Sequence, residues 1–291
     1  FVIVLAIRNK WMITLIYNIK SLTNFRKAQE SNQNKYDIFI TAKQCGLNIG
    51  VLSGLIQGGM MDSFCNSEVE IPNRCRLVLE AQAFNILTDR EKRNILQLGE
   101  KFNYDVLETI HSIVKDSLIA DDGKPIMKPS RFETFKKKYS SYRDIYDKNK
   151  DHLKFANWFF ERKYLGYSHS TQIKNVFGNS SDLYDSLELK SIPDNDRVKF
   201  VGVVTDCISR TSRAGNKYMR VEMQDDFGKV NFMLANNRRS ATLDRYLDEG
   251  GKKPKEDQIV FVYGSKGEDI IFGEKINILD EKIYTKLSEI K

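Results

Sequence analysis

The spacing of apolar residues changes once along this chain, at the polar stretch SIPDND (residues 191–196). Before it, apolar residues recur mostly at helical spacing, as in the segment 73–87. After it, apolar and polar residues alternate through VKFVGVV (198–204), which is the period of a β-strand. Proline within a polar cluster is typical of a linker. We therefore predict a helical region over residues 24–190, a linker at 191–196 and a β domain over 197–283.

The β domain is expected to contain five strands, with a short helix between the third and the fourth. The first strand is 198–204, and a hairpin over 211–234 supplies the next two. A helical insert around 240–249 precedes two further strands, Gln258 to Ser265 and Asp269 to Leu279. This order of elements is that of the OB-fold, a small Greek-key barrel. A length of 291 residues is enough for two domains, so we predict a multidomain α+β protein.

The hairpin TSRAGNKYMRVEMQDDFGKVNFML (211–234) carries the candidate binding site. On one face the alternating side chains are apolar, and we expect them to form the barrel interior: Met219, Val221, Met223, Val230, Phe232 and Leu234. The candidate nucleic-acid-binding residues are cations and one aromatic ring on or beside the opposite face: Arg210, Arg213, Lys217, Tyr218, Arg220, Lys229, Arg238 and Arg239. A base can stack on a tyrosine ring while neighbouring cations meet phosphates.

Two alternatives apply to the charges of this hairpin. Residues 208–239 contain seven Lys or Arg against three Asp or Glu, and such charges can simply be a solvated sheet face. Asp225 and Asp226 are a carboxylate pair, but they belong to a D-x-x-G turn. We expect them to form the turn rather than to bind a metal or catalyse a reaction.

Composition limits the classes of partner and the cellular compartments that we expect for this protein. The formal charge of +7 and the pI of about 9.0 favour an acidic partner such as nucleic acid. The four cysteines form no C-x-x-C pair, and the three histidines have no metal-ligand spacing. The first apolar run, Phe1 to Ile7, is too short to span a bilayer. We therefore predict a cytoplasmic protein with reduced thiols, no metal site and no membrane partner.

Upstream of the β domain, four segments are similar to motifs of one protein family. LSGLIQGGMMDSF (52–64) is similar to its L-I-x-x-G-A-F-D segment, and Asn73-Arg74 to the N-R that follows. ITLIYNIK (13–20) is similar to I-x-x-G-L-x-x-I-K. FFERKYLGYSHS (159–170) is similar to E-x-x-x-L-G-F-Y-x-S-x-H-P.

Within the β domain, SRAG (212–215) and MQDDFG (223–228) are similar to the T-K-x-G-like loop and the L-x-D-x-x-G turn of the same family. Taken together, the chain resembles the C-terminal portion of the bacterial DNA polymerase III alpha subunit, in a divergent form of phage or environmental kind. It departs from the family pattern at Ser21-Leu22-Thr23, where glycines are expected, and at Arg220, where the family has an aromatic residue.

The resemblance implies a helix-hairpin-helix region within 24–190 that grips duplex DNA, and an OB-fold domain that holds single-stranded template. Residues 1–23 would be the end of a fingers-like hairpin. Backbone N–H groups at Gly54, Gly58 and Gly59 would meet phosphates, although Gly58 and Gly59 can equally be a helix cap. The resemblance also places the catalytic palm and its Mg²⁺ ions before residue 1, so this chain would contribute no catalytic residue and no cofactor site to a DNA-directed DNA polymerase, a nucleotidyltransferase of DNA replication. A sliding clamp would be a plausible further partner.

Two other functions stay open from the sequence. The chain can be a freestanding OB-fold protein that binds single-stranded nucleic acid and carries a helical partner domain. It can also be a helical scaffold whose β domain makes protein contacts. A tRNA synthetase shares the OB signature, but the motifs of its catalytic domain are missing from the sequence.

Overall fold

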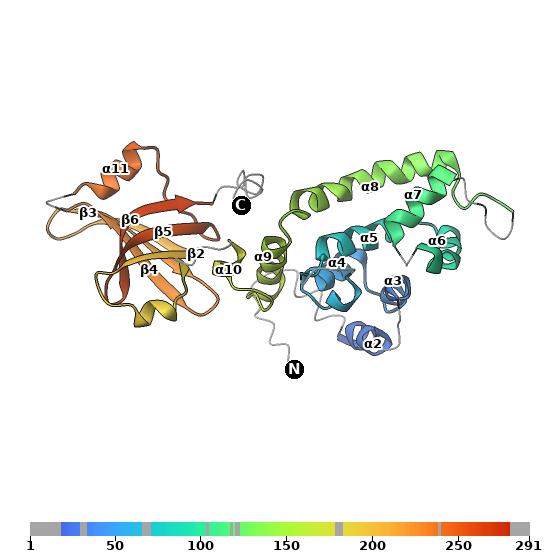
Figure 1. Ribbon diagram of the computed structural model, residues 1–291, viewed down its shortest axis with the longest axis horizontal. Helices are drawn as coiled ribbons and strands as arrows, with labels where there is room; N and C mark the ends of the chain where they lie inside the picture. Colours follow the sequence, from blue (N-terminus) through green and yellow to red (C-terminus); the bar gives the residue numbers. More distant parts are fainter. Residues whose placement is uncertain are drawn as a thin grey trace. The chain divides into compact units, whose positions relative to one another are not determined.

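The structure, a computed structural model, describes residues 19–29, 34–65, 71–102, 105–116, 119, 123–177, 183–237 and 240–279. The chain divides into two compact units between Tyr167 and Ser168. The first unit is helical and the second is a β-barrel with short flanking helices (Figure 1). An α+β protein with a helical region followed by an OB-fold barrel is thus confirmed.

The described helices of the first unit are α2 (Ile19–Gln29), α3 (Lys35–Gln44), α4 (Ile49–Gln57), η1 (Asp62–Phe64), α5 (Arg74–Ile86), α6 (Asp89–Gln97), η2 (Glu100–Phe102), α7 (Val106–Asp116), α8 (Pro129–Asn149) and α9 (Leu153–Leu165). The helices α3, α4, α5 and α6 begin with a side-chain cap, whereas α8 and α9 have none. Asn34, Asn48 and Asn73 each accept a hydrogen bond from a backbone N–H in the first turn of α3, α4 and α5. Thr88 and Glu91 form a capping box at α6. Local sequence therefore fixes where these helices begin.

The core of the helical unit is built around α5. This helix packs against α3, α4, α7, α8 and α9, and α8 runs beside it in Figure 1. Tyr36 and Phe84 are buried, and their rings lie 5.5 Å apart. On α8, Phe132, Phe135 and Tyr139 pack toward the same core. Lys136, Lys137 and Lys138 of this helix are exposed, whereas Arg131 pairs with Glu91 of α6.

The barrel is made of β2 (Arg197–Thr211), β3 (Lys217–Gln224), β4 (Lys229–Ala235), β5 (Ile259–Lys266) and β6 (Ile270–Ile278). Hydrogen-bonded neighbours follow the order β2-β3-β4-β6-β5, and β5 pairs with β2 to close the barrel. The pair β4–β6 is parallel and the other barrel pairs are antiparallel. Helix α11 (Thr242–Asp248) connects β4 to β5 and packs against β3 and β4 (Figure 1). This closure is that of an OB-fold.

Strand β2 belongs to both sides of the barrel. Its first half pairs with β5 and its second half with β3, and the register with β3 shifts between Val204 and Asp206. Such a bulge bends a strand and increases its twist. The residues predicted to face the interior are all buried there: Met219, Val221, Met223, Val230, Phe232 and Leu234. At the β5–β6 shift, a Cβ on Gly273 would lie 2.2 Å from Phe232 Cζ, so only glycine fits.

The observed division of the chain differs from the predicted boundary. The second unit starts at Ser168 and includes α10 (Ile173–Val176), β1 (Leu183–Tyr184) and η3 (Glu188–Ser191). Residues 191–196 are therefore a turn inside this unit rather than a linker between domains. The reason is physical: β1 pairs in parallel with β2, and side-chain hydrogen bonds tie this segment to the barrel.

The expected fingers-like hairpin at 1–23 lies mostly outside the described residues, and its last residues, 19–23, form the start of α2. None of the described helices combines the length and the apolar character needed to cross a bilayer.

Candidate nucleic-acid interface

The outward face of the barrel is organised in rows that run across β2, β3, β4 and β6. Cross-strand partners point to the same side of a sheet. The row nearest the β2–β3 loop contains Arg210, Tyr218 and Ala235. The second row contains Ile208, Arg220, Met233 and Phe272. The third row contains Asp206, Glu222, Asn231 and Ile270.

The first two rows combine exposed cations with aromatic and apolar side chains. Arg210 and Arg220 are exposed, and neither forms an ion pair with a residue that the structure describes. Tyr218 is partly exposed beside Arg210, and Phe272 is 49% exposed at the far end of the second row. A surface of this kind can stack bases and meet phosphates.

Arg213 lies in the loop that leads into this face. Gly215 has φ +81°, a backbone conformation that favours glycine. The Ser212 hydroxyl accepts from the N–H of Asn216, and Ser212 N–H donates to the Asn216 carbonyl. The loop is therefore closed by its own hydrogen bonds and holds Arg213 exposed beside the first row.

Two predicted cations already have acidic partners. Lys229 Nζ lies 2.6 Å from Glu222 Oε1. Lys217 Nζ lies 4.0 Å from Asp244 Oδ1 on α11. Arg238 and Arg239 lie outside the described residues. The structure thus separates the predicted set into paired lysines and arginines that remain available.

Sequence reasoning missed Phe272 and Ile208. The alternation of β6 indicates that Ile271 faces inward and Phe272 outward, and this signal was present in the sequence. What it could not show was the parallel pairing of Phe272 with Met233, which joins β6 to the hairpin face. The pairing is long-range and leaves no local pattern.

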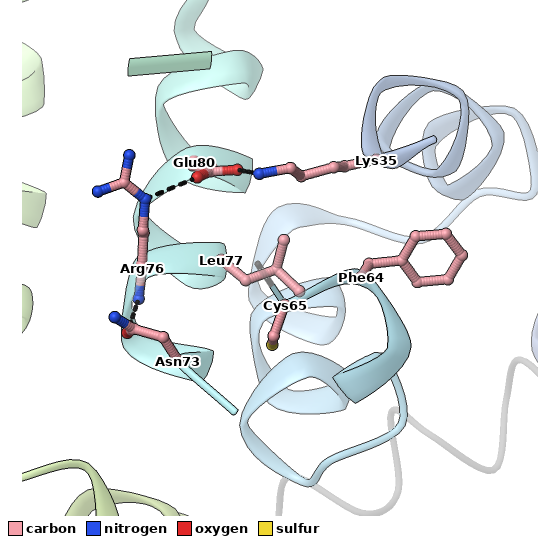
Figure 2. A pocket seen from close by; sticks show the side chains of 7 residues that line it. All are labelled: Lys35, Phe64, Cys65, Asn73, Arg76, Leu77 and Glu80. Carbon is pink, nitrogen blue, oxygen red and sulfur yellow. Dashed lines mark hydrogen bonds and ion pairs between the residues drawn. The ribbon is translucent and has the colours of Figure 1, made fainter. Parts of the chain in front are cut away.

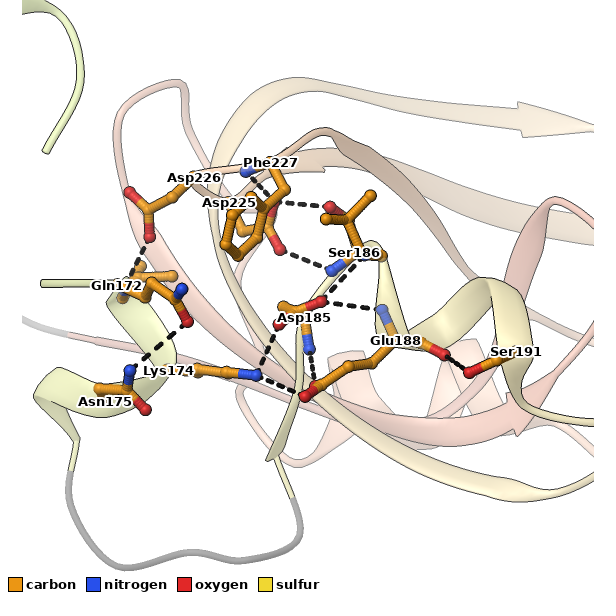
Figure 3. Close-up of polar contacts among 12 residues, drawn as sticks. Gln172, Lys174, Asn175, Asp185, Ser186, Glu188, Ser191, Asp225, Asp226 and Phe227 are labelled. Atoms are coloured by element: carbon orange, nitrogen blue, oxygen red, sulfur yellow. Dashed lines mark hydrogen bonds and ion pairs between the residues drawn. The ribbon is translucent and has the colours of Figure 1, made fainter. Parts of the chain in front are cut away.

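The D-x-x-G turn has the structural role that was predicted for it. Asp225 is 2% exposed and accepts hydrogen bonds from Ser186 N–H, Ser186 Oγ, Phe227 N–H and Gly228 N–H. Asp226 accepts from the N–H of Ile173 at 2.6 Å. Figure 3 shows these contacts between the turn and the segment that precedes the barrel. The two carboxylates therefore attach that segment to the β3–β4 turn.

An ion-pair cluster strengthens the same attachment. Lys174 Nζ lies 2.5 Å from Asp185 Oδ2 and 2.7 Å from Glu188 Oε1 (Figure 3). Desolvation acts against ionisation of Asp185, but the hydrogen bonds from Lys174 and from Glu188 N–H prevail and lower its pKa. This cluster attaches α10 to the segment 183–188, and both belong to the barrel unit.

In the helical unit, the turn that contains Gly58 and Gly59 forms the C-terminal cap of α4. Gly59 has φ +87°, and the N–H groups of Gly58, Gly59 and Met60 donate to the carbonyls of Gly54, Ile56 and Leu55. This pattern is the Schellman motif of a helix C-terminus. Gly54 has a different reason for being glycine, because a Cβ there would lie 3.3 Å from Tyr164 Cε1.

Three charged residues of the upstream motifs, Asp62, Arg74 and Glu161, meet in one cluster. Arg74 is fully buried and donates to Asp62 at 2.6 and 2.7 Å and to Glu161 at 2.6 Å. Its Nη1 also approaches the Gln57 carbonyl at 3.4 Å. Desolvation opposes the charge, but the hydrogen bonds to Asp62 and Glu161 raise the pKa of Arg74. The cluster joins α4, α5 and α9.

A second polar cluster lines a small pocket at α5 (Figure 2). Figure 2 shows Lys35 of α3 reaching Glu80, which also pairs with Arg76. Cys65 lies in the same lining, and burial, followed by the charge of Asp62, raises the pKa of its thiol to about 12. The thiol is therefore protonated and is no nucleophile. Within the described ranges, no group of three or more His, Cys, Asp or Glu side chains is placed to hold a metal ion.

Comparison with known proteins gave no family model that matches the chain. No curated protein matches it either. Solved structures with partial likeness include yeast Stn1 and Ten1, at 8% identity and TM-score 0.25, with 32% of this chain and 48% of that chain covered. A second is the mitochondrial single-stranded DNA-binding protein Rim1 of S. cerevisiae, at 15% identity and TM-score 0.24, with 30% of this chain and 98% of that chain covered. A third is the second OB-fold domain of replication protein A from Methanococcus maripaludis, at 18% identity and TM-score 0.25, with 34% of this chain and 96% of that chain covered. At these TM-scores the function must be argued from the residues of this chain.

Proposed function

We propose that the barrel binds single-stranded nucleic acid across the first two rows of its outward face. The observation that carries the proposal is the combination of Tyr218 and Phe272 with Arg210, Arg213 and Arg220, which have no ion-pair partner among the described residues. Bases stack on exposed rings whatever their sequence, and arginines meet the phosphates between them.

The arrangement favours a single strand over a duplex. Stacking needs the face of a base, and in a duplex that face is covered by neighbouring bases. The rings of Tyr218 and Phe272 stand on a sheet surface rather than on a helix or ribbon that could enter a groove. We therefore expect little sequence preference and weaker binding of duplex DNA.

The test is equilibrium binding of the full chain to a labelled oligothymidylate over a range of salt concentrations. Each phosphate neutralised on a single strand contributes a slope of roughly −0.7 in log K against log salt. Contacts from the three arginines would give a slope of about −2. An affinity that ignores salt would refute the proposal and favour a protein-contact role for the barrel. Equal affinity for a duplex of the same length would refute the preference for a single strand.

A second, finer function is a DNA-holding role in a polymerase III alpha subunit-like protein. The buried cluster supports it, because Asp62, Arg74 and Glu161 come from three of the four upstream segments that carry the resemblance and are joined by short hydrogen bonds. In this role the chain would hold duplex and template during DNA synthesis. Catalysis and Mg²⁺ would belong to a palm domain encoded upstream, and a sliding clamp would be a further partner.

Duplex contact in this second role would need donors other than those first expected. The N–H groups of Gly58, Gly59 and Met60 already donate to carbonyls of α4, so a phosphate would have to be met by groups beyond this cap. The deciding observation is the coding sequence upstream of Phe1. Palm carboxylate motifs in the same reading frame would support the polymerase role, whereas a start codon close to Phe1 would leave the freestanding single-strand binder.

A further inference from the structure

Glu222 interrupts the cationic surface at the third row of the barrel face. It lies two residues beyond Arg220 on β3, on the same side of the sheet. Its Oε1 accepts from Lys229 Nζ at 2.6 Å and from Thr205 Oγ1 at 2.7 Å. The one cation that β4 offers to this face is therefore held by a carboxylate of the neighbouring strand.

The bulge in β2 explains how Thr205 reaches Glu222. Val204 pairs with Met223 and Asp206 pairs with Glu222, which leaves Thr205 as the extra residue between them. Its hydroxyl contacts both the carboxylate and the backbone carbonyl of Glu222. A bulge redirects a side chain in this way, and here it fixes the position of the carboxylate beside Lys229.

The hydrogen bonds keep this carboxylate charged. The bond from Lys229, and then the bond from Thr205, lower the pKa of Glu222. A nucleic-acid phosphate that approached Lys229 would have to compete with an ionised carboxylate oxygen already in hydrogen-bond contact with one of the three donors of the ammonium group. Lys229 is partly exposed, with 59% of its side chain accessible, so access does not prevent the exchange; competition does.

We infer that Glu222 is a built-in counter-ion that withholds Lys229 from nucleic acid and limits the bound strand to the first two rows. Glu222 thus sets the extent of the contact rather than its chemistry. This inference rests on the proposed binding of single-stranded nucleic acid. It assigns Thr205 a positioning role, because the hydroxyl orients the carboxylate that occupies Lys229.

The decisive variant is Glu222→Gln, which keeps the shape of the side chain and removes its charge. Lys229 then becomes available for one more phosphate. For a single strand this steepens the slope of log K against log salt by about 0.7, which corresponds to about fivefold tighter binding at 0.1 M salt than without that contact. Thr205→Val should tighten binding in the same direction by less, because Lys229 still holds the carboxylate.

Lys229→Gln supplies the control that separates the counter-ion role from simple repulsion. Alone, it should change the affinity little. Combined with Glu222→Gln, it should abolish the gain and return the salt slope to that of the unaltered protein. A gain that persists in the double variant would overturn the inference, since it would come from lost repulsion and not from Lys229.

The same measurements separate the two proposals. If the unaltered chain binds the oligothymidylate with a salt-dependent affinity, and Glu222→Gln changes neither affinity nor slope, the counter-ion role is refuted and the binding function stands. If neither the unaltered chain nor Glu222→Gln binds, the proposed function fails and the inference fails with it. Thermal unfolding of each variant verifies that the barrel remains folded.

Discussion

The helical unit and the barrel face use charged residues in opposite ways. In the helical unit, Arg74 and Glu161 are fully buried, and Arg74 Nη1 lies 2.6 Å from Glu161 Oε1. These two charges therefore neutralise each other within the unit. On the barrel face, Arg210 and Arg220 are exposed and have no ion-pair partner among the described residues. The first arrangement joins α5 to α9 within the unit, whereas the second leaves charge available to a partner.

The comparison shows why counting charges says little about function. The motif residues that gave the resemblance its weight, such as Asp62 and Arg74, are structural in this chain. The hairpin residues, whose charges could equally have been solubilising, are the ones left available. Pairing and burial, which depend on tertiary structure, decide between these roles.

The largest effect is expected from Arg74→Met. It removes the cation that lies 2.6 Å from the fully buried Glu161 carboxylate, and breaking a buried pair in this way costs about 3–5 kcal/mol. Lys43→Gln is the matched control, because Lys43 and Asp89 form an exposed pair with 66% and 83% of their side chains accessible. It should cost at most about 1 kcal/mol. The free energy of unfolding, measured by denaturant titration, checks both values.

Equal losses of unfolding free energy for Arg74→Met and Lys43→Gln would contradict this prediction. They would mean that burial does not make the Arg74–Glu161 pair more costly to break than the exposed Lys43–Asp89 pair. The binding of single-stranded nucleic acid by folded Arg74→Met should stay unchanged, because the substitution lies in the helical unit and the proposed contacts lie in the barrel.

Much of the barrel was predictable because its signals are local. The period-two alternation of 217–224 and 229–235 assigned each side chain to the interior or the outside, and burial confirms the interior set. The D-x-x-G turn predicted a structural Asp225, which its hydrogen bonds confirm. Asn73 likewise indicated the start of α5. In each case the determining contacts lie within a few residues.

The features of the fold and of the candidate site that could not be predicted depend on contacts between distant segments of the chain. The bond from Ser186 to Asp225 brings residues before 191 into the barrel unit, although their composition reads as helical region and linker. The pairing of Lys229 with Glu222 requires the register of two strands and the rotamers of both side chains. Neither the sequence period nor the charge pattern contains that information.

An intermediate effect is expected on the affinity of the barrel for a single strand. Replacing Tyr218 or Phe272 with Ala should each weaken binding of an oligothymidylate by about 1–3 kcal/mol, because each ring would lose a stacked base. Phe227→Ala is the matched control. Phe227 is 44% exposed but belongs to the β3–β4 turn, at the opposite end of β3 from Tyr218. It should leave the dissociation constant unchanged.

If Phe227→Ala reduced the affinity as much as Tyr218→Ala, any exposed ring of the hairpin would contribute to binding. The proposal that the strand binds only across the first two rows would then be wrong. Loss on Tyr218→Ala alone would confine the bound strand to β2 and β3 and exclude Phe272 of β6.

The smallest effect is expected from a comparison between two cations that flank the β2–β3 loop, Arg210 of β2 and Lys217 of β3. Arg210→Gln should reduce the steepness of the salt slope by about 0.7, which corresponds to one phosphate contact on a single strand. Lys217→Gln should reduce it by less, because Asp244 lies 4.0 Å from the ammonium group and competes with phosphate. The slopes are measured with one oligonucleotide and one salt series, so both variants share every condition.

Since Lys217 and Asp244 are both exposed, the competition of Asp244 with phosphate is weak. The difference between the two slopes measures how far even a distant acidic neighbour reduces the binding of a lysine to nucleic acid. Equal slopes would mean that Asp244 has no such influence, and that the counter-ion effect requires the close, threonine-supported geometry found at Glu222.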